Sequence, residues 1–196
     1  MSGYLLKFKQ SYSVKIGGRR YPVVKIGNQL WMAENLDFIP AGVNFNPDNL
    51  IDGNPNCAYY NKASAEPFEH SGLLYNFAAV KVVDSYIQVN NPGWRVGTYS
   101  DYTTLKNYAG NNPGTKLCSK DFNGTDDFGF ALTGAGLWDA NGNFRYLNSR
   151  CELWTTNEID STYAYEFECE VYDTYFTNRR SFAAAGYSIR LVKSIE

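Results

Sequence analysis

The segment YAYEFECEVY, residues Tyr163–Tyr172, carries the strongest secondary-structure signal in the chain. Side chains expected on its buried face are Tyr163, Tyr165, Phe167, Cys169 and Val171. The intervening positions are mostly acidic and carry Ala164, Glu166, Glu168, Glu170 and Tyr172. Because successive side chains of a β-strand point to opposite faces, this alternation predicts a strand with one buried face and one face in water.

The three glutamates on the face expected in water have alternative interpretations. Side chains two residues apart on one strand face lie about 7 Å from each other, which suits a catalytic pair of acids or an acidic binding strip. Acid–base chemistry, however, needs a cleft that shifts pKa values, and a flat exposed strand offers none. We therefore expect solvated glutamates, with Arg179 and Arg180 of the following strand as cross-strand partners.

Short strands are expected on both sides of this segment. Asn141-Gly142 is a favoured two-residue turn and predicts a hairpin from Leu137 to Tyr146. The other strands expected in this half are Phe128–Leu132, Leu153–Thr156, Tyr175–Phe182 and Tyr187–Val192. A run of short strands separated by turns is typical of an antiparallel sheet.

The first half of the chain combines strands, a long polar region and two helices. Gly17-Gly18 predicts a hairpin turn. Strands are expected at Ser13–Ile16, Tyr21–Ile26 and Gln29–Met32, and one more, Cys57–Tyr60, within the ordered loop Asp37–Ser71. Helices are predicted at Gly72–Asp84, capped by Ser71, and at Ser100–Gly110, with Ser100 as the cap and Gly110 as the end. The pattern predicts an α+β fold, with residues 1–12 as an extension and residues 13–196 as one domain.

The composition excludes several classes of protein. The chain has 196 residues, and its 16% aromatic content is too high for a disordered chain. Its 18 basic and 20 acidic residues leave a formal charge of −2, which argues against a nucleic-acid partner. The sequence has no apolar run near the roughly 20 residues that a membrane-spanning helix needs. The start of the chain lacks the pattern of a signal peptide, so we expect either a protein not exported by that route or one whose leader is removed.

Histidine and cysteine usage argues against most metal and nucleophile chemistry. The sequence has one histidine, His70, which stands in a polar stretch without a nucleophile motif, so we expect a loop residue. Zinc sites and facial triads that need two histidines are excluded. The cysteines Cys57, Cys118, Cys151 and Cys169 form no CxxC pair, and we expect buried thiols. A disulfide between Cys151 and Cys169 stays open as an alternative if their strands are neighbours.

A series of segments carries a resemblance to a known family. The first is Val24–Leu36, which reads VKIGNQLWMAENL. The others follow in the family's order and are Gly72–Val80, Gly93–Val96, Asp101–Leu105, Gly129–Leu132, the Asn141-Gly142 hairpin, Trp154–Glu158 and Tyr187–Val192. On these segments, which extend from Ser13 to Lys193, the chain resembles the Fibrobacter succinogenes major paralogous domain family.

The resemblance implies a C-type-lectin-like fold, related to the scaffold of the formylglycine-generating enzyme, in which two helices flank a twisted antiparallel sheet. The family occurs mostly on secreted or surface proteins of Bacteroidetes and Fibrobacter relatives, and related lectin-like folds serve as phage receptor-binding domains. Two cysteines usual in the family are replaced here by Asn90 and Leu191, so the resemblance implies that their disulfide is missing. A virion component assembled in the reducing cytoplasm of a bacterium is consistent with that loss.

Oxygen-bearing side chains around Gly124 have two interpretations. Calcium favours ligands of the kind found at Asp121, Asn123, Asp126 and Asp127. The EF-hand pattern is incomplete, however, and Asx residues around a glycine are also typical of a turn between strands. We favour the turn and expect no cofactor, with Ca²⁺ at these four residues as the alternative.

The late β-region is rich in aromatic, amide and charged side chains. Tyrosine and tryptophan offer a large, rigid contact area with a polar tip, which suits recognition of proteins and stacking on sugar rings. With 16 tyrosines in the chain, we expect several to lie outside the core. The residues expected to contact a ligand are Trp138, Asp139, Asn141, Tyr146, Tyr163, Tyr172, Tyr175, Arg179 and Arg180.

These observations predict a non-enzymatic binding module, exposed on a cell surface or a virion, that recognises a protein or glycan ligand. Nucleic acid and membrane insertion are not expected, whereas a homo-oligomer or a complex with virion proteins is compatible with the sequence. The alternative function is a structural decoration or fibre subunit of a phage virion or bacterial surface assembly. An enzyme is disfavoured because the late cysteines, Cys151 and Cys169, lack the paired-cysteine motif of the formylglycine-generating relatives.

Overall fold

The computed structural model describes residues 12–62 and 71–195, and within them strands and helices mix as the predicted α+β class requires. The first strands are β1 (Tyr12–Ile16), β2 (Arg19–Ile26), β3 (Gln29–Met32), β4 (Asn44–Phe45), β5 (Asn56–Ala58), β6 (Leu74–Tyr75) and β7 (Arg95–Val96). The later strands are β8 (Leu137–Trp138), β9 (Phe144–Arg145), β10 (Arg150–Glu158), β11 (Tyr163–Glu170), β12 (Thr177–Phe182) and β13 (Leu191–Ser194). The helices are α1 (Phe77–Asn90), α2 (Tyr99–Ala109), α3 (Pro113–Leu117), and the short 3-10 helices η1 (Tyr60–Lys62) and η2 (Lys120–Phe122). Among these described residues, no helix has both the length and the apolar character needed to cross a bilayer.

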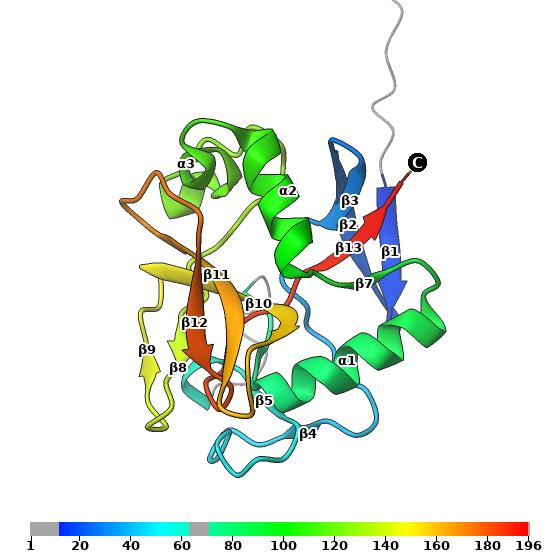
Figure 1. Cartoon of the computed structure of the whole chain (residues 1–196), viewed down its shortest axis with the longest axis vertical. Helices are drawn as coiled ribbons and strands as arrows, with labels where there is room; N and C mark the ends of the chain where they lie inside the picture. The colour runs from blue at the N-terminus through cyan, green and yellow to red at the C-terminus, as the bar shows by residue number, and fades with distance from the viewer. Residues whose placement is uncertain (1–11, 63–70, 196) are drawn as a thin grey trace, which may run out of the picture.

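A five-stranded antiparallel sheet contains both the first and the last strand, in the order β1-β2-β3-β13-β7 (Figure 1). The Gly17-Gly18 turn joins β1 to β2 as predicted, and both glycines have the positive φ that such a turn needs. In β2, the buried Tyr21 and Val23 lie next to the exposed Arg20 and Pro22, whereas in β3 Trp31 and Met32, on opposite faces, are both buried, so core residues pack on both faces of this sheet. The last strand begins at Leu191 rather than Tyr187, because Tyr187 forms an isolated bridge with Tyr75 instead.

Helix α1 begins at Phe77, so the predicted start at Gly72 is wrong. The side chain of Asn76 accepts a hydrogen bond from the Ala79 amide and caps the helix in place of Ser71. The preceding residues Leu74–Tyr75 are extended instead, because they pair with β5 as strand β6. The buried positions of α1 then follow at helical spacing and carry Phe77, Ala79, Val80, Val83 and Ile87.

Helix α2 lies close to its predicted place, but its cap is Thr98 rather than Ser100. Thr98 and Asp101 form a capping box, in which each side chain accepts a hydrogen bond from the other residue's backbone amide. Gly110 ends the helix as predicted. The short helix α3 follows and was not predicted; Pro113 stands at its start, where a missing amide hydrogen costs nothing.

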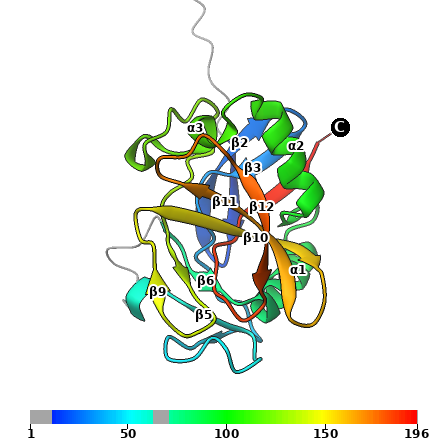
Figure 2. The same ribbon diagram turned by 60° about the vertical axis from the view of Figure 1, so that its left-hand side comes forward.

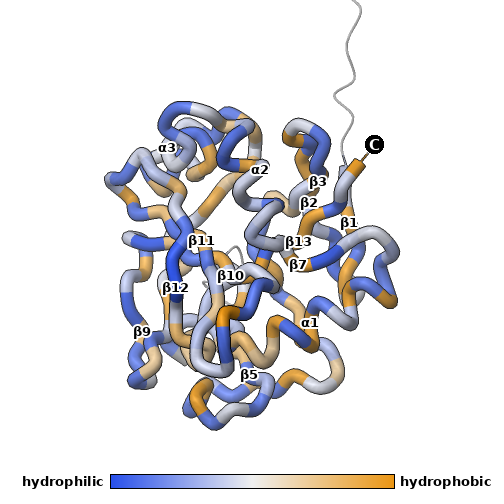
Figure 3. Tube along the Cα trace, viewed as in Figure 1, coloured by the Kyte–Doolittle hydropathy of each residue, from blue (hydrophilic) through white to orange (hydrophobic). Residues whose placement is uncertain are grey.

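Strands β10, β11 and β12 form a second antiparallel sheet, which comes forward in Figure 2. In its register, Glu152 lies opposite Glu168, and Glu166 lies opposite Arg179. The central part of β12 is hydrophilic along its length (Figure 3). The hairpin β8–β9 around Asn141-Gly142 is confirmed. Residues 128–132 are not a strand, since Leu132 makes only an isolated bridge with Cys118.

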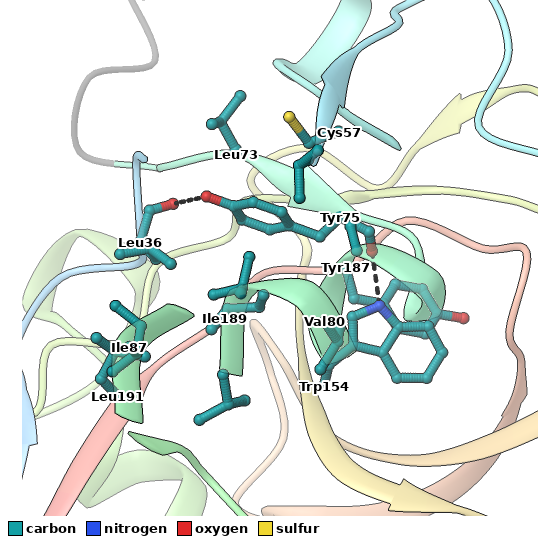
Figure 4. Packing of buried hydrophobic residues seen from close by; sticks show 14 of the residues in the cluster. Leu36, Cys57, Leu73, Tyr75, Val80, Ile87, Trp154, Tyr187, Ile189 and Leu191 are labelled. Carbon is teal, nitrogen blue, oxygen red and sulfur yellow. Dashed lines mark hydrogen bonds between the residues drawn. The ribbon is translucent and has the colours of Figure 1, made fainter. Parts of the chain in front are cut away.

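The core joins segments that are far apart in the sequence. In the larger cluster, the indole Nε1 of Trp154 donates to the carbonyl of Tyr75 over 2.7 Å, and the Trp154 ring packs 4.5 Å from that of Tyr187 (Figure 4). A second cluster places Phe167 of β11 against Tyr102 of α2, with ring centroids 5.3 Å apart. The middle of the apolar face predicted for the Tyr163–Tyr172 segment, at Tyr165 and Phe167, therefore packs against α2.

One cation is also fully buried in this core. Arg190 has no exposed surface, and four acceptors surround its guanidinium. These acceptors are the side-chain oxygen of Asn35 and the carbonyls of Met32, Phe130 and Ala131. The Phe130 ring also lies 4.9 Å from the guanidinium carbon. Arg190 therefore links the segment before β13 to two loops that are remote in sequence.

Candidate functional site

The face of β11 that the sequence predicts to lie in water is instead buried and forms part of a pocket. Only 3% of Glu152, 1% of Glu166 and 4% of Glu168 is exposed. The expectation of solvated glutamates is therefore wrong for Glu166 and Glu168. The physical reason is that Leu137 of β8 and the segment through Ala185 and Tyr187 line the same pocket and cover this face of the sheet.

The pocket has a volume of about 420 Å³ and an opening to solvent. Its base is the acidic face of β10 and β11, and one wall is β12. The hairpin β8–β9 forms the opposite side. The residues that line it are Leu137, Asp139, Ala140, Asn141, Arg145, Tyr146, Arg150, Glu152, Glu166, Glu168, Arg179, Arg180, Ser181, Phe182, Ala185 and Tyr187.

Two arginines pair with part of the acidic face. Arg150 forms an ion pair with Glu170, and its Nη1 lies 3.5 Å from Glu152 Oε1 and 3.9 Å from Glu168 Oε2. Arg179 of β12 forms an ion pair with Glu168 Oε1. The prediction that Arg179 lies across from the glutamates is thus confirmed. These pairs leave the carboxyl groups of Glu152 and Glu166 only weakly bonded.

Three buried carboxyl oxygens have no hydrogen-bond partner: Oε2 of Glu152, of Glu166 and of Glu168. The remaining oxygen of Glu166 accepts only a long hydrogen bond, 3.5 Å, from the hydroxyl of Ser181. Buried polar atoms without a partner are rare in proteins, because each keeps its desolvation cost of about 1–3 kcal/mol. Their concentration at the base of one pocket distinguishes this place from the rest of the core.

The same burial shifts the pKa values of these acids. Burial raises the pKa of Glu152 from its ordinary 4.5 to about 8, with Arg150 acting against the shift and Glu168 adding to it. Burial also raises the pKa of Glu166 well above its ordinary value, and the neighbouring Glu152 and Glu168 add to the shift. The pKa of Glu168 is raised by burial too, although Arg179 and Arg150 oppose this. At neutral pH, Glu152 therefore mainly holds its proton, and the pKa of Glu166 is shifted in the same direction.

Five residues expected to contact a ligand line this pocket: Asp139, Asn141, Tyr146, Arg179 and Arg180. Asp139 organises the β8–β9 turn, because its Oδ1 accepts the amide hydrogens of Asn141 and Asn143 while its other oxygen pairs with Arg145. Tyr146 is exposed at the edge of the pocket, and the Arg150 guanidinium lies 4.4 Å from its ring centre.

A second hollow of about 380 Å³ continues from the pocket. Tyr146 and Arg150 line both, and the second also includes Glu170 and Tyr172. Tyr172 is 90% exposed, the most of any large hydrophobic side chain in the described residues. The two tyrosines therefore form an aromatic edge beside the carboxyl groups.

The guanidinium of Arg180 and the remaining residues of the expected contact surface lie elsewhere. The Arg180 guanidinium stacks 3.6 Å from the ring centre of Tyr163, on the other face of the sheet from Glu166. Tyr175 is exposed in the turn before β12. Trp138 is buried against Phe144 and the Leu50–Ala58–Leu74 cluster, so it belongs to the core and not to the exposed surface.

The candidate calcium ligands form a turn. Asn123 ends η2 and donates from its side chain to the carbonyl of Val171. Asp126 has a positive φ and accepts the amide hydrogen of Ala131. Asp121 and Asp127 complete the set as part of the same loop region. Within the part of the chain that the structure describes, His, Cys, Asp and Glu side chains form no group of three or more placed to hold a metal ion.

The four cysteines are buried and unpaired. Cys151 and Cys169 do lie opposite each other on β10 and β11, but the sulfur nearest to Cys169 Sγ is Cys118 Sγ, at 3.0 Å. Burial raises the pKa of the Cys57 thiol to about 12 and also raises the pKa of Cys151. His70 lies outside the described residues.

Sequence reasoning missed Glu152, Arg150 and Ser181 as parts of the site. The segment Arg150–Leu153 alternates charged and apolar residues, as the Tyr163–Glu170 strand does. Pairing the two strands would have placed Arg150 and Glu152 on the face of Glu166 and Glu168. That register, and the cover over this face, depend on contacts between segments that the sequence does not show to be neighbours.

Comparison with known proteins supports one assignment. No curated protein and no solved structure matches the chain. A family model does match, over residues 24–193, and its description is the Fibrobacter succinogenes major domain. The matched region includes the β10-β11-β12 sheet, all three α-helices and every residue of the pocket. The chain therefore belongs to the Fibrobacter succinogenes major domain family.

Proposed function

We propose that the chain is a non-enzymatic ligand-binding module whose contact surface is the pocket over β10, β11 and β12. The single observation that carries this proposal is the set of unpartnered carboxyl oxygens at the base of the pocket. A fold that buries such atoms loses free energy unless something else bonds them. A ligand that enters the pocket would supply the missing hydrogen bonds.

The edge of the pocket suits recognition. Tyr146 and Tyr172 offer exposed aromatic rings next to charged groups, the combination that concentrates binding free energy at interfaces. Asn141, in the turn of the β8–β9 hairpin, adds a polar group at the opposite side. The pocket thus combines an adaptable polar and aromatic edge with a buried polar base.

Binding is favoured over covalent catalysis by the state of the thiols. A catalytic cysteine needs a lowered pKa, so that it is ionised at neutral pH. Burial has the opposite effect on Cys57 and Cys151, whose thiols stay protonated. The contact surface also stands apart from the Cys118–Cys169 sulfur contact, because Cys169 lies on the other face of β11 from Glu168.

We further propose that the scaffold is C-type-lectin-like and that the module is exposed on a cell surface or a virion. The arrangement of α1 and α2 around antiparallel sheets, and the presence of β1 and β13 in one sheet, support the proposal. The ligand is a protein or glycan of a cell surface. An experimental structure compared with lectin-like folds tests the scaffold directly.

The function is tested by binding to glycan arrays and to whole bacterial cells. We expect the Tyr146→Ala and Tyr172→Ala variants to lose binding at least about tenfold, with the melting temperature unchanged, because both side chains are exposed. Tyr108→Ala is the matched control, since Tyr108 is an exposed tyrosine on α2 outside the pocket. Binding that survives both pocket variants would contradict the proposal. Absence of binding together with a stable oligomer would favour a structural subunit instead.

A further inference from the structure

We infer that the base of the pocket accepts the ammonium group of a lysine side chain from a protein partner. The inference rests on the proposed function and adds the chemical class of the ligand. It starts from the carboxyl groups of Glu152 and Glu166, each at least nine-tenths buried and each with an oxygen that has no hydrogen-bond partner.

When Glu152 and Glu166 are ionised, the charges on this face of the sheet do not balance. The acidic face of the sheet carries four carboxyl groups, those of Glu152, Glu166, Glu168 and Glu170. Two guanidinium groups face them, and both are already paired: Arg150 with Glu170, and Arg179 with Glu168. Arg145 is paired with Asp139, and Arg180 stacks on Tyr163. Glu152 has only the long ion pair with Arg150, at 3.5 Å, and Glu166 has none among the described residues, so a ligand with positive charge would complete the set.

The unpartnered oxygens also suit the donors of an ammonium group. A primary ammonium carries three hydrogen-bond donors on one compact atom and has no acceptor. The pocket offers acceptors from neighbouring positions, since Glu152 lies directly opposite Glu168 and Glu166 is two residues along the same strand face. Side chains opposite each other in an antiparallel pair have Cβ atoms about 5 Å apart. One small cation between them could therefore reach more than one carboxyl group.

The depth of the acids favours a lysine side chain over other cations. The carboxyl oxygens lie at the base of the pocket, so a thin stem with a charged end reaches them more readily than a sugar ring that carries its amine directly. Lysine has such a stem, four carbons long. The aromatic ring of Tyr146, at the edge of the pocket, suits an aliphatic stem. A metal ion is disfavoured because, in the described chain, acidic side chains form no group of three placed to ligate one.

The binding of a cation here must depend on pH. Glu152 is mainly protonated below its pKa of about 8, so an ammonium displaces a proton when it binds. The groups that face Glu152 and Glu166 from the surrounding elements are Arg150 on β10, Glu168 and Glu170 on β11, Arg179 on β12, Asp139 and Arg145 on the hairpin, and Tyr187. The arginines stay charged throughout, and burial holds the pKa of Tyr187 above its ordinary value. The acids themselves are therefore the groups that titrate.

The test is an NMR titration of the full chain with Nα-acetyl-lysine methylamide, with uncharged norleucine amide derivatives and with glucosamine as comparison probes. We expect the lysine probe alone to shift resonances at Glu152, Glu166 and Ser181. Its affinity should rise as the pH rises toward 8, by up to about tenfold per pH unit for one displaced proton. Glu152→Gln and Glu166→Gln should each weaken binding by about tenfold or more. Glu158→Gln, a charge-removing change at the exposed end of β10, should leave it unchanged.

The outcomes separate this inference from the proposed function. Equal shifts with the lysine and uncharged probes, or binding of glucosamine alone, would overturn the assignment of a lysine ammonium group. An affinity that does not change with pH or with Glu166→Gln would overturn it as well. If the probe fails while Tyr146→Ala and Tyr172→Ala still abolish cell or glycan binding, only the ligand class is wrong. If the Tyr146→Ala and Tyr172→Ala variants have no effect either, the proposed function is wrong as well as the ligand class.

Discussion

Two buried ionisable regions of this protein have opposite surroundings. Arg190 is completely enclosed, yet four oxygen acceptors bond its guanidinium. Glu152 and Glu166 are almost equally enclosed, yet each keeps an oxygen without a partner. A buried charge with all its bonds made holds segments of the fold together, whereas buried acids that lack bonds keep a capacity to bind. The difference teaches that burial by itself does not distinguish a structural group from a functional one.

The two main sheets repeat this contrast. In the Arg20–Val23 part of β2, the buried Tyr21 and Val23 alternate with the exposed Arg20 and Pro22. In β11 the same kind of alternation has both faces buried from Ala164 to Cys169, apart from Tyr165. The apolar face of β11 packs on α2, and the acidic face lies under the pocket. The same sequence pattern thus has a different outcome where other elements cover the polar face.

The largest effect is expected from the fully bonded cation. Arg190→Met should lower the free energy of unfolding by about 3–5 kcal/mol, because it leaves buried acceptors such as the Met32 and Phe130 carbonyls without donors. Chemical denaturation measures this loss. Arg20→Met, at an exposed position of β2, is the control and should change little. A loss below about 1 kcal/mol for Arg190→Met would break the contrast with the pocket.

Replacing Glu152, in contrast to replacing Arg190, should stabilise the fold, and the size of this gain should depend on pH. Glu152 has a folded-state pKa of about 8 against an ordinary 4.5, so its contribution to stability is fully present below 4.5 and is lost as the pH rises toward 8. The Glu152→Gln variant has no ionisable group at this position, so it does not lose this stability as the pH rises. We expect the variant to be more stable than the parent by at least about 1 kcal/mol at pH 8, and by much less near pH 4. Melting temperatures across this pH range test it, and a constant difference would contradict it.

A smaller effect should appear when both Glu152 and Glu166 are neutralised. Glu152 and Glu166 raise each other's proton affinity, since Glu152 adds to the upward shift of the pKa of Glu166. Removing one charge therefore relieves part of the cost of the other. At pH 8 the gain of the double variant Glu152→Gln/Glu166→Gln should fall short of the sum of the single gains by about 0.5 kcal/mol or more. Strict additivity in a double-mutant cycle would show that the two acids do not share one site.

The smallest effect on stability is expected at the edge of the pocket. Tyr172→Ala should change the free energy of unfolding by no more than about 0.5 kcal/mol, because the side chain is 90% exposed. Trp154→Ala, at a buried aromatic of the same region, is the informative comparison and should cost about 3–5 kcal/mol. Thermal denaturation of both variants measures the difference. A large loss for Tyr172→Ala would mean that Tyr172 is a structural residue.

Local signals predicted much of the fold. The Gly17-Gly18 turn lies where its backbone requirement places it, whereas Asn141-Gly142 lies inside a longer loop, residues 139–143, in which Gly142 but not Asn141 has a positive φ. Gly110 also ends α2 as predicted. Local signals did not predict the N-cap residues of α1 and α2, because the chain offers several acceptable ones near each helix start: Ser71, Asn76, Thr98 and Ser100. Asn76 and Thr98 form the caps because strand pairing at β6 and the capping box with Asp101 decide between them.

The sequence alone determined the strand periodicity of Tyr163–Tyr172, the two glycine hairpins, the helical stripes and the family to which the chain belongs. Only the tertiary structure decided that the acidic face of β11 is covered, that Glu152 joins it, and that Cys169 meets Cys118 instead of bonding Cys151. The physical reason is the range of the interactions. Periodicity and turns depend on neighbouring residues, whereas the burial of a face depends on segments that arrive from elsewhere in the chain.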